Sequence, residues 1–379
     1  MTRDASKPSD AAPAGDRVGT AGPAAIESRL ASVHTTNFPE LLRSLNCSLA
    51  ISTYQAGKLV LLRADGDVVN THFRSFNRPM GMAVDGARLA LGTHVEIIEY
   101  RNMPAVAERL PDPPRHDAVY MARHSHVTGA IDIHEMARDA GGALWFVNTL
   151  FSCLCTLDSE SSFVPRWRPP FVTSYAPEDR CHLNGLGMRE GRPYYLTALG
   201  ASNSPQGWRA DKRDGGVLLD MRANRILARG LSMPHSPRWH DNRVLLLESG
   251  RGALVSIDPQ TGARTDVARV PGFARGLALV GPIAFIGLSQ LREDGAFTDI
   301  EMTEDNADRH SGVWAVHIPS GRTLGLLKFT GGVQEIFDVQ IMHGVLRPEI
   351  IHEGDVLATT YALPDEALGE VAFSGLSRE

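Results

Sequence analysis

One short pattern recurs six times along the chain: a strand-like apolar segment that begins after a small or polar residue. The occurrences begin near residues 80, 131, 184, 236, 275 and 337, at intervals of about 40 to 60 residues. The segments are rich in Val, Ile, Leu, Phe and Tyr and are broken by Gly, Asp, Asn and Pro, as in GALWFVNT, RVLLLES and PIAFIGLS. Such segments are typical of β-strands. Only residues 38–45 and the short stretch IHEMARDA suggest helix.

Repeats of this length, each with room for about four strands, predict an all-β chain folded as a six-bladed β-propeller. Residues 47–75 form strands but precede the first repeat, whereas the last repeat has room for about two strands before the end of the chain. We therefore predict that the last blade is shared, with inner strands from the C-terminal segment and outer strands from residues 47–75. The expected organisation is a disordered tail over residues 1–30, one propeller domain over 31–365 and a C-terminal tail over 366–379.

Composition narrows the possible partners. A net charge of -6 argues against a general nucleic-acid binder, which needs a basic face. No run approaches about 18 apolar residues, so we expect no membrane span, and the N-terminus lacks the apolar core of a secretory signal. Four cysteines in 379 residues do not indicate a disulfide framework, and Cys153 and Cys155, in CLC, are expected to be buried structural thiols rather than a metal pair. These observations predict a cytoplasmic protein.

The longest and most polar loops are expected on one face of the propeller. Strands alternate in direction within a blade, so the loops that lead into the inner strands share a face with the loops between second and third strands. His and Arg residues gather in these segments, for example in EDRCHLN, SMPHSPR and PGFARG. Long loops in a compact domain are usually functional or disordered. The sequence therefore predicts a ligand site at this mouth of the central channel.

Three histidines are candidate metal ligands. His182 and His235 are expected at nearly equivalent positions in neighbouring blades, and His134 lies on the inner strand of the preceding blade. Imidazoles that converge from adjacent blades could bind a divalent transition metal. The alternative is that they hydrogen-bond the backbone where the blades begin, or contact a substrate. Spacing across blades does not decide between these interpretations.

Other polar residues of the same face are candidates for catalysis and substrate binding. Glu335 and Asp338 could act as general bases if the channel removes them from water, although each could instead bind a neighbouring blade's amides or an Arg. Arg275 is a further candidate catalytic residue. Candidate groups for binding a small polar or anionic substrate are Asn184, Asn203, Trp208, Arg209, Arg238 and Arg292.

Several motifs together resemble an uncharacterised bacterial family of conserved hypothetical proteins. They are CHLNGLG, ASNSPQGWR, MPHSPRW, GFARGLA and EIFDVQ, within roughly residues 35–350. The resemblance implies a β-propeller fold and no particular activity or substrate.

Two functions stay open at this point. One is a metal-dependent enzyme that acts on a small polar or anionic substrate at the channel mouth. The other is a non-enzymatic propeller that binds a small molecule, a peptide or another protein.

Overall fold

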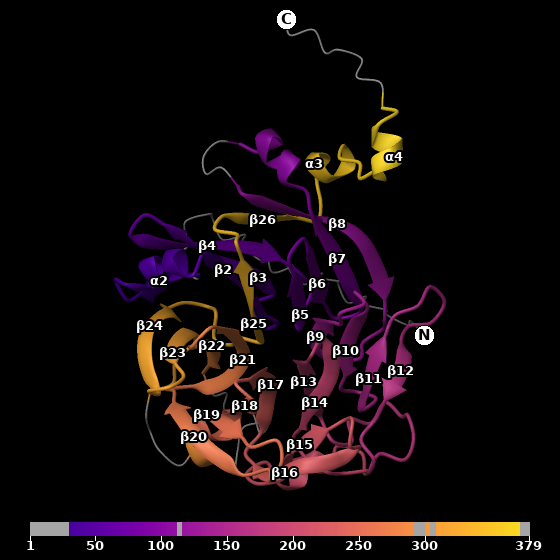
Figure 1. Cartoon of the computed structure of the whole chain (residues 1–379), viewed down its shortest axis with the longest axis vertical. Helices are drawn as coiled ribbons and strands as arrows, with labels where there is room; N and C mark the ends of the chain where they lie inside the picture. The colour runs from indigo at the N-terminus through magenta and orange to yellow at the C-terminus, as the bar shows by residue number, and fades with distance from the viewer. Residues whose placement is uncertain (1–29, 112–115, 291–299, 304–307, 372–379) are drawn as a thin grey trace, which may run out of the picture.

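The computed structural model describes residues 30–111, 116–290, 300–303 and 308–371. In these residues the chain forms six sheets whose innermost strands contact one another in sequence, so that the last meets the first (Figure 1). The predicted six-bladed β-propeller is confirmed. The inner strands begin within three residues of the six sites that the repeat predicts.

The blades are numbered in the order in which their innermost strands occur along the chain, and the strands of each blade are given from the innermost outward. Blade 1 contains β5 (Met82–Asp85), β6 (Arg88–Gly92), β7 (Glu96–Asn102) and β8 (Ala118–Val127). Blade 2 contains β9 (Ile133–Arg138), β10 (Leu144–Asn148), β11 (Cys153–Thr156) and β12 (Val164–Trp167). Blade 3 contains β13 (Leu183–Arg189), β14 (Arg192–Ala198), β15 (Gly216–Asp220) and β16 (Arg225–Leu231).

Blade 4 contains β17 (Pro234–His240), β18 (Arg243–Glu248), β19 (Ala253–Ile257) and β20 (Arg264–Arg269). Blade 5 contains β21 (Phe273–Val280), β22 (Ile283–Ser289), β23 (Gly312–His317) and β24 (Arg322–Phe329), with β1 (Ser32–His34) outside it. Blade 6 contains β25 (Asp338–His343), β2 (Cys47–Thr53), β3 (Lys58–Asp65) and β4 (Val68–Ser75).

The apolar core lies between blades rather than within one. One cluster joins Leu245 and Leu254 of blade 4 to Leu277 and Ile286 of blade 5, all at most 3 % exposed. Middle strands are therefore buried on both faces, which explains continuous apolar runs such as RVLLLES in place of strict alternation. The four cysteines are free thiols and buried, which confirms the predicted burial of Cys153 and Cys155.

The shared blade is confirmed, with one correction. β25 pairs antiparallel with β2, which places Val339 opposite Ile51. The C-terminal segment contributes only this one strand to blade 6, because β2 occupies the second position. The next strand, β26 (Pro348–Ile351), instead pairs in parallel with β8 at the outer edge of blade 1. β26 and β1 thus cover outer strand edges that would otherwise lie open.

Helices are few and short in the described residues. The expected helix appears as α2 (Phe38–Ser44), with a proline in its first turn. The helical interpretation of IHEMARDA is wrong: Ile133–Arg138 is β9, because pairing with β10 and burial of Ile133 and Met136 outweigh local propensity. The remaining elements are α3 (Asp355–Ala358), α4 (Asp365–Leu368), η1 (Pro104–Arg109), η2 (Gly207–Ala210), η3 (Ser249–Arg251) and η4 (Glu301–Thr303).

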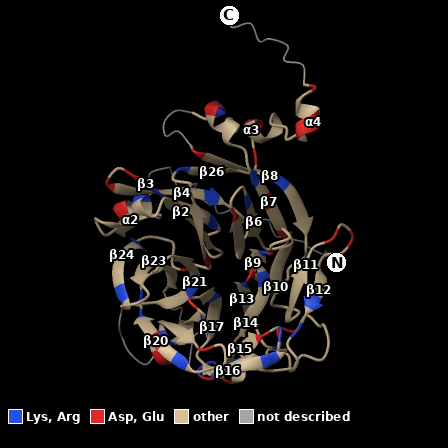
Figure 2. Cartoon of the chain, viewed as in Figure 1, with Lys and Arg blue, Asp and Glu red and all other residues tan. Residues whose placement is uncertain are grey.

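Figure 1 shows α3 and α4 standing beside the ring, beyond β26. Basic and acidic residues are interspersed around the ring, and α4 begins with two acidic residues, Asp365 and Glu366 (Figure 2). Among the helices of the described residues, none is both long and apolar enough to cross a lipid bilayer.

Candidate functional site

A pocket of about 210 Å³ opens at the end of the channel where the inner strands begin. We call it the mouth pocket. Its described lining consists of Tyr54, Arg78, Met80, Asp132, His134, His182, Leu199, Trp208, Arg209, Met233, His235, Phe273, Arg275 and Phe337. The structure therefore brings together six of the predicted site residues: His134, His182, His235, Trp208, Arg209 and Arg275.

His134 and His235 occupy equivalent positions, each the second residue of its inner strand. This corrects the expected equivalence of His182 with His235, because His182 lies just before β13 and Asn184 holds the equivalent position in blade 3. His134 Nδ1 lies 2.8 Å from the Thr149 hydroxyl, and His235 Nδ1 lies 2.8 Å from the Ser249 hydroxyl.

These hydroxyls determine which ring nitrogen carries the proton. The Thr149 hydroxyl donates its one hydrogen to the Leu183 carbonyl at 2.6 Å, and the Ser249 hydroxyl donates to the Ala274 carbonyl at 2.5 Å. Each hydroxyl oxygen must therefore accept a hydrogen bond from the histidine Nδ1–H. Burial, and then the nearby Arg275 guanidinium, hold the pKa of both histidines well below the ordinary value. Both rings are neutral at pH 7, with an unprotonated Nε2.

His182 has a different partner. Its Nδ1 lies 3.0 Å from both carboxylate oxygens of Asp179. The indole N–H of Trp208 donates to the same carboxylate at 2.8 Å, and the Trp208 ring packs 4.6 Å from the His182 ring. On its other side, His182 meets the His134 ring edge-on at 4.8 Å. Asp179 thus leaves Nε2 as the nitrogen of His182 that a ligand can use.

Three guanidinium groups of the mouth pocket each stand over an aromatic ring. The Cζ atom lies 5.8 Å from the ring centroid for Arg78 over Tyr54, 4.3 Å for Arg209 over Trp208, and 3.5 Å for Arg275 over Phe337. Stacking of this kind orients a guanidinium plane, whose N–H groups form hydrogen bonds within that plane. Asp132 is the one carboxylate in the described lining, 3.8 Å from Arg78.

The backbone is strained where three consecutive blades begin. Asp132, His182 and Met233 each directly precede an inner strand and have φ of 53°, 49° and 46°. Side-chain-bearing residues in this left-handed region cost roughly 1–3 kcal/mol each and cluster at functional sites. The strain here lies along the rim of the mouth pocket.

Below the mouth pocket, polar groups join neighbouring inner strands. Asp338 accepts a hydrogen bond from the Met82 amide at 2.9 Å, and Glu135 accepts one from the Leu186 amide at 2.7 Å. The Arg238 guanidinium pairs with Glu135 and donates to the Leu277 carbonyl at 2.8 Å. These contacts match the alternative interpretation of the channel acids, in which they bind neighbouring amides or an Arg.

The other predicted residues lie apart from the mouth pocket. Asn184 and Asp338 line a small internal cavity of about 10 Å³ beneath it, next to Arg275. Arg238 lines a separate cavity at the opposite end of the channel, and its guanidinium pairs across the inner strands with Glu135 of β9. The Asn203 side chain accepts hydrogen bonds from Thr173 and Arg180.

Two candidate residues remain. Glu335 accepts hydrogen bonds from the Thr53 hydroxyl and the Gln55 amide at 3.3 and 3.4 Å. Arg292 lies outside the described residues.

No three His, Cys, Asp or Glu side chains of the described chain lie close enough together to hold one metal ion. The predicted metal at His134, His182 and His235 stays a prediction.

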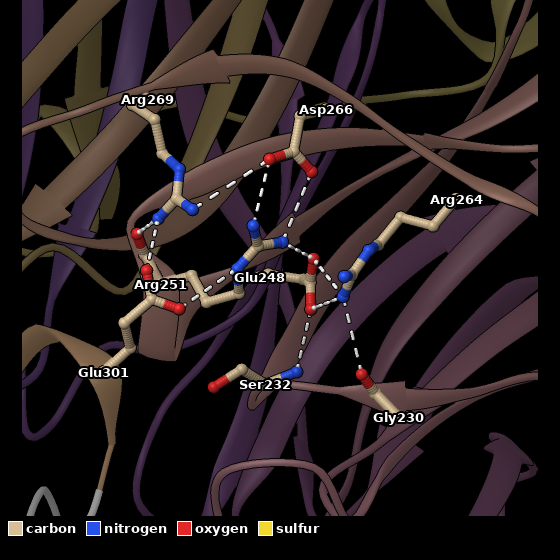
Figure 3. A network of polar contacts seen from close by, with 8 residues as sticks. All are labelled: Gly230, Ser232, Glu248, Arg251, Arg264, Asp266, Arg269 and Glu301. Atoms are coloured by element: carbon tan, nitrogen blue, oxygen red, sulfur yellow. Dashed lines mark hydrogen bonds and ion pairs between the residues drawn. The ribbon is translucent and has the colours of Figure 1, made fainter.

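An ion-pair network centred on the buried carboxylate of Glu248 supports one side of the mouth pocket (Figure 3). Glu248 is fully buried and accepts hydrogen bonds from the Ser232 amide at 3.0 Å, Arg251 at 2.6 Å and Arg264 at 2.9 Å. Arg251 also lies 3.4 Å from Glu301 of η4. The neighbouring residues of that segment, Ile300 and Met302, pack in a cluster with the pocket residues Leu199, Trp208, Met233 and Phe273. The network therefore ties η4 to the pocket wall.

Sequence reasoning missed Asp179, Thr149 and Ser249. EDRCHLN contains Asp179 three residues before His182, a spacing that could have suggested the pair. The two hydroxyls follow second strands, in FVNT and LLES, at equivalent places. Their proximity to the histidines depends on blade packing, which no local pattern reports.

Comparison with known proteins identifies a family and the fold. A family model described as a domain of unknown function (DUF4915) matches residues 36–351. No curated protein matches the chain. A chain from a crystal structure of a nidogen/laminin complex is similar at 11% identity with a TM-score of 0.52, covering 79% of this chain and 99% of that one. A protein of unknown function from Bacteroides caccae is similar at 9% identity and a TM-score of 0.47, covering 78% and 98%. At 11% identity, the likeness to the chain of the nidogen/laminin complex concerns the fold alone.

Proposed function

We propose that the mouth pocket of this chain, which belongs to the DUF4915 family of unknown function, binds a small organic anion. The observation that carries this proposal is the set of three guanidinium–aromatic pairs around one cavity. Guanidinium forks bind carboxylates in a planar, paired geometry, and the adjoining rings accept a flat apolar group. A pocket of about 210 Å³ is smaller than the roughly 300–1,000 Å³ of sites for drug-sized ligands, which favours a small ligand.

The neutral histidines add a preference for hydrogen-bond donors. Nε2 of His134 and Nε2 of His235 are acceptors at pH 7, because each Nδ1 carries the ring proton. A ligand with a hydroxyl or N–H group beside its carboxylate would satisfy them. Hydroxy acids and related small carboxylates are therefore the class that this pocket suits best.

Binding of matched acids and amides tests the proposal. Isothermal titration calorimetry would compare acetate, pyruvate, benzoate and mandelate with the corresponding amides. At least one carboxylate should bind tenfold or more tightly than its amide, since the amide lacks the charge that the guanidinium groups recognise. Arg275→Gln should abolish this preference, whereas Arg192→Gln, an exposed Arg at the hairpin end of β14, should preserve it. Equal binding of acids and amides, or no binding by any acid, would contradict the proposal.

A metal-dependent enzyme is the second candidate. The hydrogen bonds at Nδ1 of all three histidines favour it, because metal-binding histidines usually engage their other ring nitrogen in this way. Elemental analysis of tag-free protein tests it. A stoichiometric transition metal that is lost in a His182→Ala, His235→Ala double variant would support it, and metal-free protein that still binds carboxylates would favour the simple binding site.

A further inference from the structure

We infer that Asp179 and His182 form an acid–base dyad. In this dyad His182 Nε2 is the basic nitrogen that takes a proton from the anion in the mouth pocket. This inference rests on the proposed anion site. It names a reacting atom where the proposed function names only a binding pocket.

The carboxylate partner distinguishes His182 from the other two histidines. His134 and His235 donate to neutral hydroxyl and carbonyl oxygens. His182 alone of the three donates Nδ1–H to a carboxylate, with both oxygens at 3.0 Å. A proton taken up at Nε2 would create an imidazolium whose charge faces Asp179 directly, as in the acid–base pairs of hydrolytic enzymes.

The dyad is held in place from several sides. The Trp208 indole N–H binds Asp179 at 2.8 Å, and the Asp179 amide donates to the Leu150 carbonyl at 2.9 Å. Asp179 and His182 both adopt left-handed backbone conformations, with φ of 47° and 49°. The surrounding contacts thus maintain a strained loop that presents the imidazole to the pocket.

The chemistry requires no further reactant. His182 Nε2 would remove a proton from a C–H or O–H group next to the ligand's carboxylate. The electron pair of the broken bond stays on the ligand as an enolate or alkoxide, and the guanidinium of Arg275, which lines the same pocket, would stabilise that charge. The substrate class is therefore a small carboxylate with an acidic hydrogen on the adjacent carbon or its hydroxyl.

Alkylation by bromoacetate tests the dyad in the intact protein. Bromoacetate carries a carboxylate for the anion site and a carbon that a nucleophilic imidazole can attack. A bond forms between His182 Nε2 and the methylene carbon, the C–Br bond breaks, and bromide leaves with the bonding pair. Peptide mass spectrometry should find the carboxymethyl group on His182. The neutral reagent bromoacetamide should label His182 at least tenfold more slowly.

Variants of Asp179 separate positioning from folding. Asp179→Asn should slow labelling of His182 by tenfold or more, because an amide can reverse the imidazole tautomer. Asp179→Glu restores a carboxylate and should recover most of the rate, which a merely structural role would not predict. Glu178→Gln changes the adjacent acid, which pairs with Arg180, and should leave the rate unchanged. Carboxylate binding by each variant checks that the pocket is folded.

The outcomes separate the dyad from the anion site. Labelling of another residue, or an undiminished rate in Asp179→Asn, would overturn the dyad even if bromoacetate still reacts faster than bromoacetamide. Equal rates for the two reagents would overturn the anion site instead. Labelling that occurs only after treatment with a chelator would also overturn the dyad, because a metal would then occupy Nε2.

Discussion

Asp338 should make the propeller less stable as the pH rises toward neutrality. The residue is 3 % exposed, and burial, followed by the nearby Glu135 carboxylate, raises the pKa of its carboxyl group to about 7. The ordinary value for an unfolded chain is 3.8. Between these two values the folded protein therefore holds a proton that the unfolded chain has lost. Linkage then requires the free energy of unfolding to fall as the pH rises through this window.

The magnitude follows from the width of the window. Each pH unit between the unfolded and folded pKa values changes the free energy of unfolding by about 1.4 kcal/mol. From pH 5 to pH 8, the loss from this single group is about 2–3 kcal/mol, and it is complete once the pH exceeds the folded pKa. The side chain at position 338 cannot ionise in the Asp338→Asn variant, so the free energy of unfolding of this variant lacks this pH-dependent loss. The exchange of one acceptor oxygen for an amino group costs about 1 kcal/mol at both pH values, so it cancels in the comparison.

Urea unfolding at pH 5 and pH 8, followed by tryptophan fluorescence, would measure the difference. The wild-type protein should lose about 2–3 kcal/mol more than Asp338→Asn between the two pH values. Asp241→Asn removes an acid whose side chain is 89% exposed and should behave like the wild type. The same pH dependence in wild type and Asp338→Asn, or a wild type that gains stability toward pH 8, would refute the reasoning.

Three further predictions concern stability. Glu248→Gln should lower the free energy of unfolding, measured in urea, by about 3 kcal/mol, because it leaves two guanidinium groups facing a buried neutral amide. Glu301→Gln, at the exposed end of the same network, should cost less than about 1 kcal/mol (Figure 3). Ser249→Ala should cost about 1–3 kcal/mol in the same assay, since it removes one of the two acceptors of His235 Nδ1–H and the donor to the Ala274 carbonyl. Truncation after residue 351 should leave the protein resistant to proteolysis. Truncation after residue 330 removes β25, which closes blade 6, and should make the protein sensitive to proteolysis. Equal resistance of the two truncated proteins would show that closure of blade 6 is dispensable.

Much of the fold could be predicted from the sequence because a propeller repeats its information. Six apolar segments with similar spacing give the number of blades, and residues 47–75, which lack an inner strand, indicate the shared blade. The path of β26 could not be predicted in this way. Its pairing with β8 depends on which outer edge is open in space, and PEII carries no signal for a particular edge.

The candidate site was only partly predictable for a related reason. Position at the start of an inner strand, or in a loop between second and third strands, identifies residues near the mouth, which is why six of the predicted residues line one pocket. Side-chain direction is not set by that position alone. Arg238 lies four residues beyond the start of β17 and reaches the opposite half of the channel. The His182 side chain lies in the pocket because its backbone adopts a left-handed conformation, which the sequence does not predict.

The joining of β2 to β25 has a consequence for synthesis in the cell. β2 emerges from the ribosome well before its inner-edge partner β25, which follows nearly three hundred residues later in the chain. At roughly 5–20 residues per second, that delay is on the order of half a minute. During this interval the apolar segment CSLAIST presents an unpaired strand edge that could capture the same segment of another nascent chain. A protein of this design should depend on chaperones that shield β2 until β25 has been synthesised.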